Sequence, residues 1–321
     1  MAKAYPDVMH HLFARMLPTL RSTLCCLTLA WPGFSRADEA LIDCHVHLWT
    51  HERPAGLTWI KKDDPLLTKD FLPPVHQTVA KASGVTGVVV VQAGQSLPDN
   101  QWNLDITAHN PALYRGVVGN LSEVIGTEKF APLLRDLSKD RRYLGYRLSG
   151  RYQTEMSEAF FRDLALTAEL GKSVDFLIGA YTLKDVDTIA KRMPNLRIIL
   201  DHFGNVKLDG KALPEEWIAD YRAVAKQPNV YCKVSALYGR FTPQPAPREL
   251  AAYRQILDLS FECFGEDRLV YGSDWPVSES TADYAALLAL TREYFATKGP
   301  SANAKLFHRN AVKFYAIPIV K

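Results

Sequence analysis

Short apolar runs alternate with amphipathic stretches along most of this chain. Apolar or β-branched runs of strand length recur eight times, and the first of them reads LIDCHVHL. They cover residues 41–48, 86–92, 114–120, 143–148, 174–178, 197–202, 229–234 and 268–272. Runs of this length and composition are typical of strands that are buried on both faces. The pattern therefore predicts eight strands.

The segments between these runs have the spacing of helices. In SEAFFRDLALTAELG, which begins at Ser157, apolar residues recur near helical spacing and Gly171 provides a C-terminal stop. Comparable stretches are LKDVDTIAKRMPN, LPEEWIADYRAVAKQPN and RELAAYRQILDLSFECFG. Alternation of strand and helix on this scale predicts an α/β fold, a (β/α)8 TIM barrel formed as one domain by residues 38–321. A doubly wound open sheet is the alternative, but no glycine-rich dinucleotide loop follows the first run.

Residues 1–37 differ from the rest of the chain. Arg15 and Arg21 precede a short apolar run at residues 24–31, and small residues lead to Ala37. This order is typical of a secretory signal peptide and predicts a periplasmic or secreted protein. The alternatives are an uncleaved N-terminal arm or a start site placed too early, either of which is compatible with a cytoplasmic protein. Since the run is too short to span a bilayer as a helix, we expect no membrane segment in the mature protein.

Charge and cysteine content exclude several classes of protein. The chain has 38 basic and 35 acidic side chains, of which four basic and one acidic lie in residues 1–37, so that 34 of each remain. A neutral mature chain does not favour a nucleic-acid partner. The cysteines beyond the leader, Cys44, Cys232 and Cys263, are scattered, which is neither a disulfide framework nor the spacing of a zinc finger.

Two histidines, His45 and His47, lie one residue apart near the end of the first predicted strand. Residues i and i+2 of a strand point to the same face, so the two rings would present nitrogen ligands side by side. The alternative is a pair of half-buried histidines that hydrogen-bond to backbone carbonyls. The pair alone does not decide between these interpretations.

A TIM barrel carries its active site at the C-terminal ends of its strands. Polar side chains occur at these positions on several predicted strands: His45 and His47, Arg147, Asp201 and His202, Lys233 and Ser235, and Asp274. The sequence therefore predicts one polar site at this end of the barrel.

Five motifs carry a resemblance to a known family. They are IDCHVHLW, ILDHFGN, NVYCKVSAL, DRLVYGSDWPV and FHRNAVKFY, and they extend from about Leu41 to Tyr315. In this order they resemble the amidohydrolase-related (amidohydrolase 2) proteins of TIM-barrel fold. The similarity is to the branch of sugar-acid lactonases of the L-fuconolactonase and L-rhamnonolactonase kind.

The resemblance implies a site and a reaction. His45, His47, His202 and Asp274 would hold one divalent metal, zinc or manganese, or would act without metal as a proton-transfer cluster. Asp274 would be the catalytic general base for the hydrolytic water, and His202, the other catalytic residue, would be a metal ligand or a hydrogen-bond donor to the substrate. A bound metal would bring the pKa of its water to about 7. Because no lysine ends the fourth predicted strand, the bridging lysine of two-metal relatives is absent.

Other residues are candidates for binding a small lactone or carboxylate substrate. The resemblance implies that Arg147 and Arg151 hold a carboxylate or polyol. Lys233 either reaches the substrate or extends along the strand to the rim. Trp49, like Trp59 and Trp102, either lines a sugar pocket or packs in the core.

The favoured function is therefore a hydrolase that opens a small lactone, in carbohydrate or related metabolism. One alternative is a decarboxylase of a muconate-like or aromatic acid from a neighbouring branch. The other is a non-catalytic binding protein on the same barrel, since function belongs to the site and not to the fold.

Overall fold

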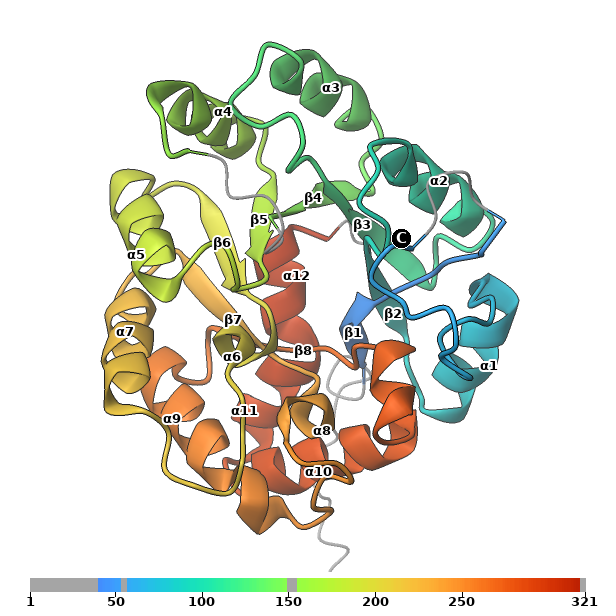
Figure 1. Ribbon diagram of the computed structural model, residues 1–321, viewed down its shortest axis with the longest axis vertical. Helices are drawn as coiled ribbons and strands as arrows, with labels where there is room; N and C mark the ends of the chain where they lie inside the picture. Colours follow the sequence, from blue (N-terminus) through green and yellow to red (C-terminus); the bar gives the residue numbers. More distant parts are fainter. Residues whose placement is uncertain (1–39, 53–56, 149–154, 318–321) are drawn as a thin grey trace, which may run out of the picture. The chain divides into compact units, whose positions relative to one another are not determined.

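Eight parallel strands follow one another around a single sheet in the computed structural model, which describes residues 40–52, 57–148 and 155–317 (Figure 1). The predicted leader, residues 1–37, lies outside these residues, as does Arg151. The strands are β1 (Ile42–Val46), β2 (Gly87–Val91), β3 (Tyr114–Asn120), β4 (Tyr143–Leu148), β5 (Ser173–Phe176), β6 (Arg197–Leu200), β7 (Val230–Val234) and β8 (Leu269–Tyr271). Each strand pairs in parallel with the next one in the sequence.

The first strand meets the segment after the last one. Val46 forms a parallel bridge with Trp275, the backbone N–H of His47 donates to the Trp275 carbonyl at 2.7 Å, and that of Asp274 donates to the His45 carbonyl at 2.8 Å. These bonds join the two ends of the sheet. The predicted (β/α)8 barrel is thus confirmed, and the open doubly wound sheet is wrong.

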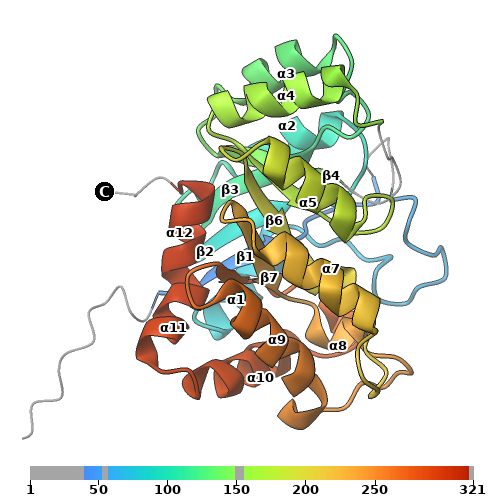
Figure 2. The same ribbon diagram turned by 90° about the vertical axis from the view of Figure 1, so that its left-hand side faces the viewer.

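Helices surround the strands, and Figure 2 shows α4, α5 and α7 side by side over one part of the sheet. The helices are α1 (Pro73–Ala82), α2 (Pro98–Thr107), α3 (Phe130–Leu137), α4 (Glu158–Glu169), α5 (Leu183–Arg192), α6 (His202–Asn205), α7 (Glu215–Ala225), α8 (Leu237–Arg240), α9 (Arg254–Phe264), α10 (Tyr284–Ala296), α11 (Pro300–Ala304) and α12 (Asn310–Tyr315). Among the described residues, none of these helices is long and apolar enough to cross a membrane.

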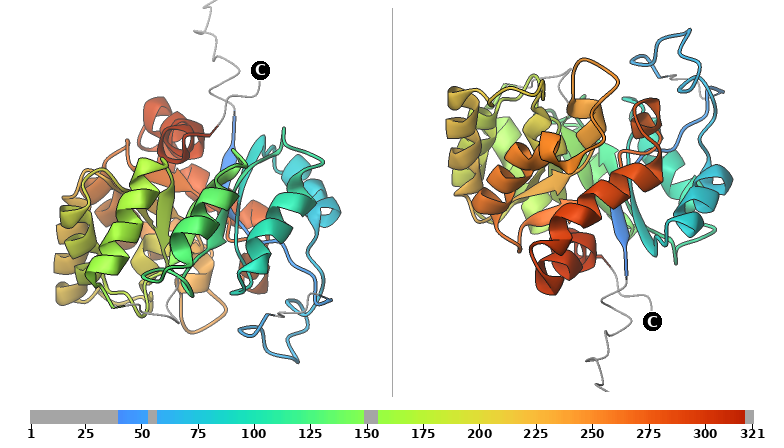
Figure 3. Two further views of the ribbon diagram at one scale, coloured as in Figure 1. Left: turned by 90° about the horizontal axis from the view of Figure 1, so that it is seen from above. Right: turned by 90° about the horizontal axis from the view of Figure 1, so that it is seen from below.

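The two ends of the barrel are covered differently. Phe314 and Tyr315 of α12 pack with strand residues such as Val89 and Ile199 in one apolar cluster. Figure 3 shows α11 and α12 on one side of the strands, and α8 with the segment after β1 on the opposite side. The C-terminal helix therefore closes one end, while the polar strand ends lie toward the other.

Several strands end sooner than their apolar runs predict. The run at 197–202 predicts a strand through His202, but β6 ends at Leu200 and Asp201 begins a turn. The run at 41–48 predicts a strand through Leu48, but β1 ends at Val46. In both places the polar residues that follow the strand no longer belong to it, and their side chains form part of the polar site at this end of the barrel.

Buried His76 of α1 makes stability depend on pH. Its Nδ1 lies 3.1 Å from the Tyr114 hydroxyl, its Nε2 has no hydrogen-bond partner among the described residues, and burial lowers its pKa from 6.5 to about 4. Below pH 6.5 the unfolded chain takes up a proton that the folded chain excludes. The stabilisation from neutral His76 is thus complete above that pH and is lost as the pH falls toward about 4.

We expect His76→Phe to flatten this pH dependence. When the pH is lowered from 7 to 5, the free energy of unfolding should decrease less in the variant than in the parent. The two decreases should differ by up to about 2 kcal/mol, since each pKa unit corresponds to about 1.4 kcal/mol. Urea unfolding at several pH values measures this difference. Exposed His109 offers a matched control, because His109→Phe should leave the slope unchanged. An equal slope in His76→Phe and the parent would contradict the prediction.

Candidate active site

One carboxylate oxygen faces three imidazoles at the polar end of the barrel. Oδ1 of Asp274 lies 3.2 Å from Nε2 of His47, 3.6 Å from Nε2 of His45 and 3.8 Å from Nε2 of His202. All four side chains are buried. The structure thus brings together the four residues that the sequence predicts for the metal or catalytic cluster, from β1 and the segment directly after it, the turn after β6 and the turn after β8.

A left-handed turn positions His202. All four residues of α6 have positive φ angles: 51° for His202, 56° for Phe203, 67° for Gly204 and 59° for Asn205. Residues of this hand other than glycine and asparagine each cost about 1–2 kcal/mol, and such strain is concentrated at functional sites. The ring of His202 is fixed by the residue that follows β7, since its Nδ1 lies 2.8 Å from the Ser235 hydroxyl.

The seam between β1 and β8 is held by Asp43. Its Oδ1 accepts from the backbone N–H groups of His45, at 3.1 Å, and Ser273, at 2.9 Å, while its Oδ2 accepts from the Tyr284 hydroxyl at 2.8 Å. Gly272 allows the strands to approach, because a Cβ there would lie 2.6 Å from Cβ of His45. Our sequence prediction does not include Asp43, although an acidic residue in a buried apolar run is a signal for such a role.

The electrostatics keep Asp274 ionised and His202 neutral. Burial would raise the pKa of Asp274, but the interactions of its carboxylate with His202, His47 and His45 together hold this pKa well below its ordinary value. Burial lowers the pKa of His202 to about 4, although Asp274 and Asp201 oppose this shift. Near neutral pH the site therefore contains a carboxylate base beside a neutral imidazole.

Lys233 lies inside the barrel, fully buried beneath the histidines. Its Nζ donates to Oδ2 of Asp175 at 2.6 Å, lies 3.0 Å from Oδ1 of Asp201 and 3.1 Å from Nδ1 of His45. Burial would lower the pKa of Lys233, but the two carboxylates raise it, so the side chain is an ammonium ion. Lys233 thus extends neither to the substrate pocket nor to the rim, and our sequence prediction does not include Asp175.

A pocket of about 440 Å³ opens above the cluster, and His47, His202 and Asp274 are part of its wall. Two guanidinium groups, those of Arg147 and Arg240, also line it. Nη2 of Arg147 donates to the Gln92 carbonyl at 2.9 Å, and Nη1 of Arg240 donates to Oδ1 of Asn205. Within the described residues, neither Nε atom has a hydrogen-bond partner. The pocket therefore offers cationic donors to an oxygen-rich ligand.

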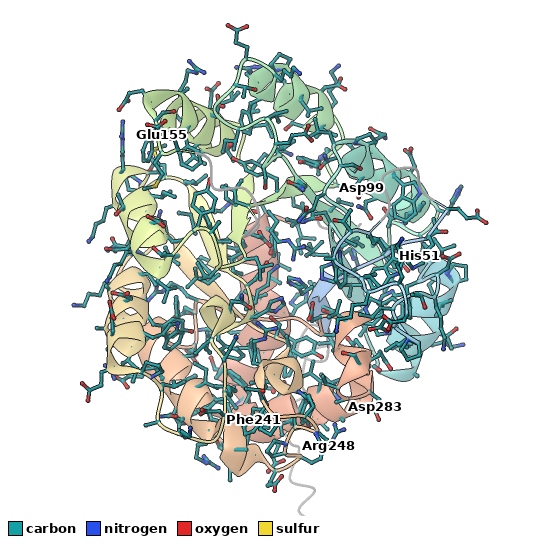
Figure 4. The ribbon with its side chains drawn as sticks, viewed as in Figure 1. His51, Asp99, Glu155, Phe241, Arg248 and Asp283 are labelled. Atoms are coloured by element: carbon teal, nitrogen blue, oxygen red, sulfur yellow. The ribbon has the colours of Figure 1, made fainter. Side chains whose placement is uncertain are left out.

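Trp49 lies outside the pocket. It is fully buried, and its Nε1 donates to the Lys69 carbonyl at 2.9 Å, so it packs in the core. Trp59, whose ring meets Trp49 edge to face, lines the pocket instead. Figure 4 labels His51 in the segment after β1, where this exposed side chain bonds to the Leu67 carbonyl.

The donor set fits a divalent cation. Nδ1 of His47 lies 2.9 Å from the Val91 carbonyl, which only accepts, so this nitrogen carries a proton. In a neutral ring the Nε2 lone pair then faces Oδ1 of Asp274, and two acceptors at this distance require a proton or a cation between them. Nε2 of His45 is likewise buried without a hydrogen-bond partner in the described part of the chain.

The clusters His45–His47–Asp274 and His45–Asp201–His202 each bring three ligand atoms within 4.8 Å of one another. Imidazole and carboxylate ligands suit zinc, and manganese also accepts them.

Comparison with known proteins places this geometry in a family. The chain is 30% identical over 285 residues to an L-fucono-1,5-lactonase from Burkholderia ambifaria, covering 86% of this chain and 95% of that protein. A crystal structure of a zinc-bound amidohydrolase from Burkholderia multivorans superposes with a TM-score of 0.76 at 24% identity, over 87% of this chain and 100% of that one. A 5-carboxyvanillate decarboxylase from Novosphingobium aromaticivorans, in complex with manganese, shares the fold with a TM-score of 0.63 at 14% identity, over 88% of this chain and 97% of that one.

Residues 42–317 match the amidohydrolase family. This range starts with β1 and extends past α12, so it includes every strand of the barrel and each residue of the cluster around Asp274. The chain belongs to the amidohydrolase family.

Proposed function

We propose that this protein is a lactonase that opens a small, oxygen-rich lactone to its hydroxy acid. The observation that carries the proposal is the Asp274 carboxylate, which is held ionised by three imidazoles in the wall of a pocket that two arginines line. The likeness to an L-fucono-1,5-lactonase supports a cyclic ester as the substrate.

The reaction needs one proton acceptor and one carbonyl-polarising group. Asp274 takes a proton from water as the water oxygen adds to the lactone carbonyl carbon. The tetrahedral intermediate then collapses, its ring C–O bond breaks, and the proton held by Asp274 passes to the leaving alkoxide. Positioned proton transfer of this kind contributes about 10²–10⁴-fold. The sum of the steps is lactone plus water to hydroxy acid.

The other side chains orient the substrate. His202 is neutral, and when its Nδ1 accepts from Ser235 its Nε2–H is directed toward the reacting carbonyl oxygen. Arg147 and Arg240 donate to hydroxyl or carboxylate oxygens of the ligand. A divalent metal, when bound by His45, His47, His202 and Asp274, would supply Lewis-acid polarisation of the carbonyl and a more acidic water.

A panel of aldonolactones and dicarboxylic lactones tests the proposal, with acid release measured for the full chain before and after chelator treatment. We expect acid release from at least one class of lactone. Loss of turnover on chelation and its recovery with zinc or manganese would assign the chemistry to a metal enzyme. Turnover that is indifferent to chelation would assign it to Asp274 and the imidazoles. Release of carbon dioxide from aromatic acids without lactone turnover would overturn the proposal in favour of a decarboxylase, and ligand binding without turnover would favour a binding protein.

Arg240→Met should weaken substrate binding more than catalysis. Arg240 lies on the pocket wall outside the cluster, and a hydrogen bond from a charged group contributes about 1.5–3 kcal/mol. We therefore expect KM to rise by about 10- to 100-fold, with a smaller change in kcat. Steady-state kinetics on the best lactone measure both. Arg135→Met provides the control, because Arg135 is exposed on α3 and lines no part of the pocket. A fall in kcat at constant KM would contradict the assignment.

A further inference from the structure

The two nitrogens of His45 face different partners. Nδ1 faces the ammonium group of Lys233 at 3.1 Å in hydrogen-bonding geometry, and Nε2 faces Oδ1 of Asp274 at 3.6 Å. An ammonium group has three N–H donors and no acceptor. Nδ1 of His45 must therefore carry its lone pair, and the single proton of the neutral ring lies on Nε2.

This tautomer is unsuited to a metal ligand. A histidine that binds a metal through Nε2 needs its lone pair there and donates its Nδ1–H to an acceptor. His47 meets this requirement, since the Val91 carbonyl accepts from its Nδ1. In His45 the proton lies on the nitrogen that would bind the metal.

A second acceptor lies close to Nδ1 of His45. Oδ1 of Asp201 is 3.4 Å away, and within the described residues neither carboxylate oxygen of Asp201 has a partner in hydrogen-bonding geometry, although Lys233 lies 3.0 Å from Oδ1 as an ion pair. If the proton of the His45 ring moves to Nδ1, the Nδ1–H group can donate a hydrogen bond to Asp201. Nε2 then carries the lone pair and is free to bind a cation. Lys233 and Asp201 thus favour opposite tautomers of one ring.

We propose that Lys233 is a positioning residue that holds metal-free His45 in the Nε2–H tautomer, and that metal binding requires His45 to transfer its Nδ1 hydrogen bond from Lys233 to Asp201. In the metal-free enzyme the Nε2–H is then directed at Asp274. Lys233 therefore lowers the metal affinity of the site.

This inference rests on the proposed function only in treating the cluster as the active site. Its test measures tautomers and metal affinity, so its failure is distinguishable from a failure to find lactone turnover.

The tautomer of the unaltered full chain is the first measurement. In protein labelled with ¹⁵N-histidine and freed of metal by chelation, long-range ¹H–¹⁵N spectra distinguish protonated from unprotonated ring nitrogens, and comparison with His45→Gln assigns the His45 signals. We expect a proton on Nε2, which moves to Nδ1 when zinc is added. A proton on Nδ1 in the metal-free protein would overturn the proposal.

Zinc affinity is the second measurement. The double variant Lys233→Met/Asp175→Asn removes one positive and one negative charge from the interior and leaves Asp201 to accept from His45. We expect it to bind zinc about 10- to 100-fold more tightly than the parent, a gain equal in size to the loss that follows when a supporting partner of a metal ligand is removed. Titration against a zinc-competing chromophoric chelator gives the Kd, and thermal unfolding shows that the variant is folded.

The matched control is Lys191→Met/Asp187→Asn. This pair forms an ion pair of 2.6 Å on the outer helix α5 and undergoes the same chemical change. Its zinc affinity should equal that of the parent. A folded Lys233→Met/Asp175→Asn protein whose zinc affinity also equals that of the parent would overturn the role of Lys233. If this variant does not fold, the tautomer of the unaltered chain decides the proposal.

Discussion

Asp274→Asn should lower kcat/KM by about 10³–10⁴-fold, near the upper limit of what positioned proton transfer contributes. Asparagine has nearly the same shape but cannot take a proton from water. It is also suited to the backbone, because Asp274 has a φ of 62° and asparagine is among the residues that tolerate this region. The hydrogen bond from the backbone N–H of residue 274 to the His45 carbonyl does not involve the side chain and should remain.

The measurement is kcat/KM on the best lactone, together with the Kd of the product acid. Binding should change far less than turnover, because Arg147 and Arg240 are unaltered. Asp105→Asn makes the same chemical change on the exposed face of α2 and should have no effect. Asp274→Asn with more than a tenth of the parent activity would exclude Asp274 as the general base.

Lys233→Met should destabilise the protein by about 3–5 kcal/mol, the cost typical of removing one partner from a buried ion pair. The ammonium group lies between Asp175 and Asp201, and all three side chains are fully buried. Methionine leaves Asp175 without its cation and leaves Asp201 with only the more distant Arg147, whose Nη1 lies 3.8 Å from Oδ2. Burial already raises the pKa of Asp175 to about 6, against the opposing effect of Lys233, and removing the lysine should raise this pKa further. The folded variant then binds a proton that the unfolded chain does not, so the loss of stability should shrink as the pH falls below that raised pKa.

Urea unfolding at pH 8 and pH 5 checks both statements. The double variant Lys233→Met/Asp175→Asn should recover part of the lost stability at pH 8, because it leaves one buried carboxylate instead of two. The exposed residue Lys226 provides the control, since Lys226→Met should change the free energy of unfolding by no more than about 0.5 kcal/mol. A single variant as stable as the parent would show that the ammonium group is not needed to hold the two carboxylates.

The sequence by itself determined the architecture of the barrel. The predicted strands at 114–120 and 143–148 coincide with β3 and β4, and each of the other runs contains or overlaps one strand. Strands that are buried on both faces need continuous apolar runs, and this requirement is local, so it can be read along the chain. The rule that barrel strands end at the active site placed His45, His47, His202 and Asp274 among the candidate residues, and the family resemblance then assigned these four to one cluster without any knowledge of their contacts.

Tertiary structure alone decided which side chains face one another. Trp49 and Trp59 are the same type of residue, and each lies between a threonine and an aliphatic residue in the sequence. Nevertheless Trp49 packs in the core and Trp59 lines the pocket. The face of β7 on which Lys233 lies follows from the alternation of side chains along the strand. Its partners Asp175, Asp201 and His45, however, come from three other strands or the turns that follow them. Asp43 likewise bonds to groups more than 200 residues away. Secondary structure follows from a periodicity within a few residues, whereas a hydrogen bond between distant strands depends on register, strand ends and ring tautomer, which only the closed barrel fixes.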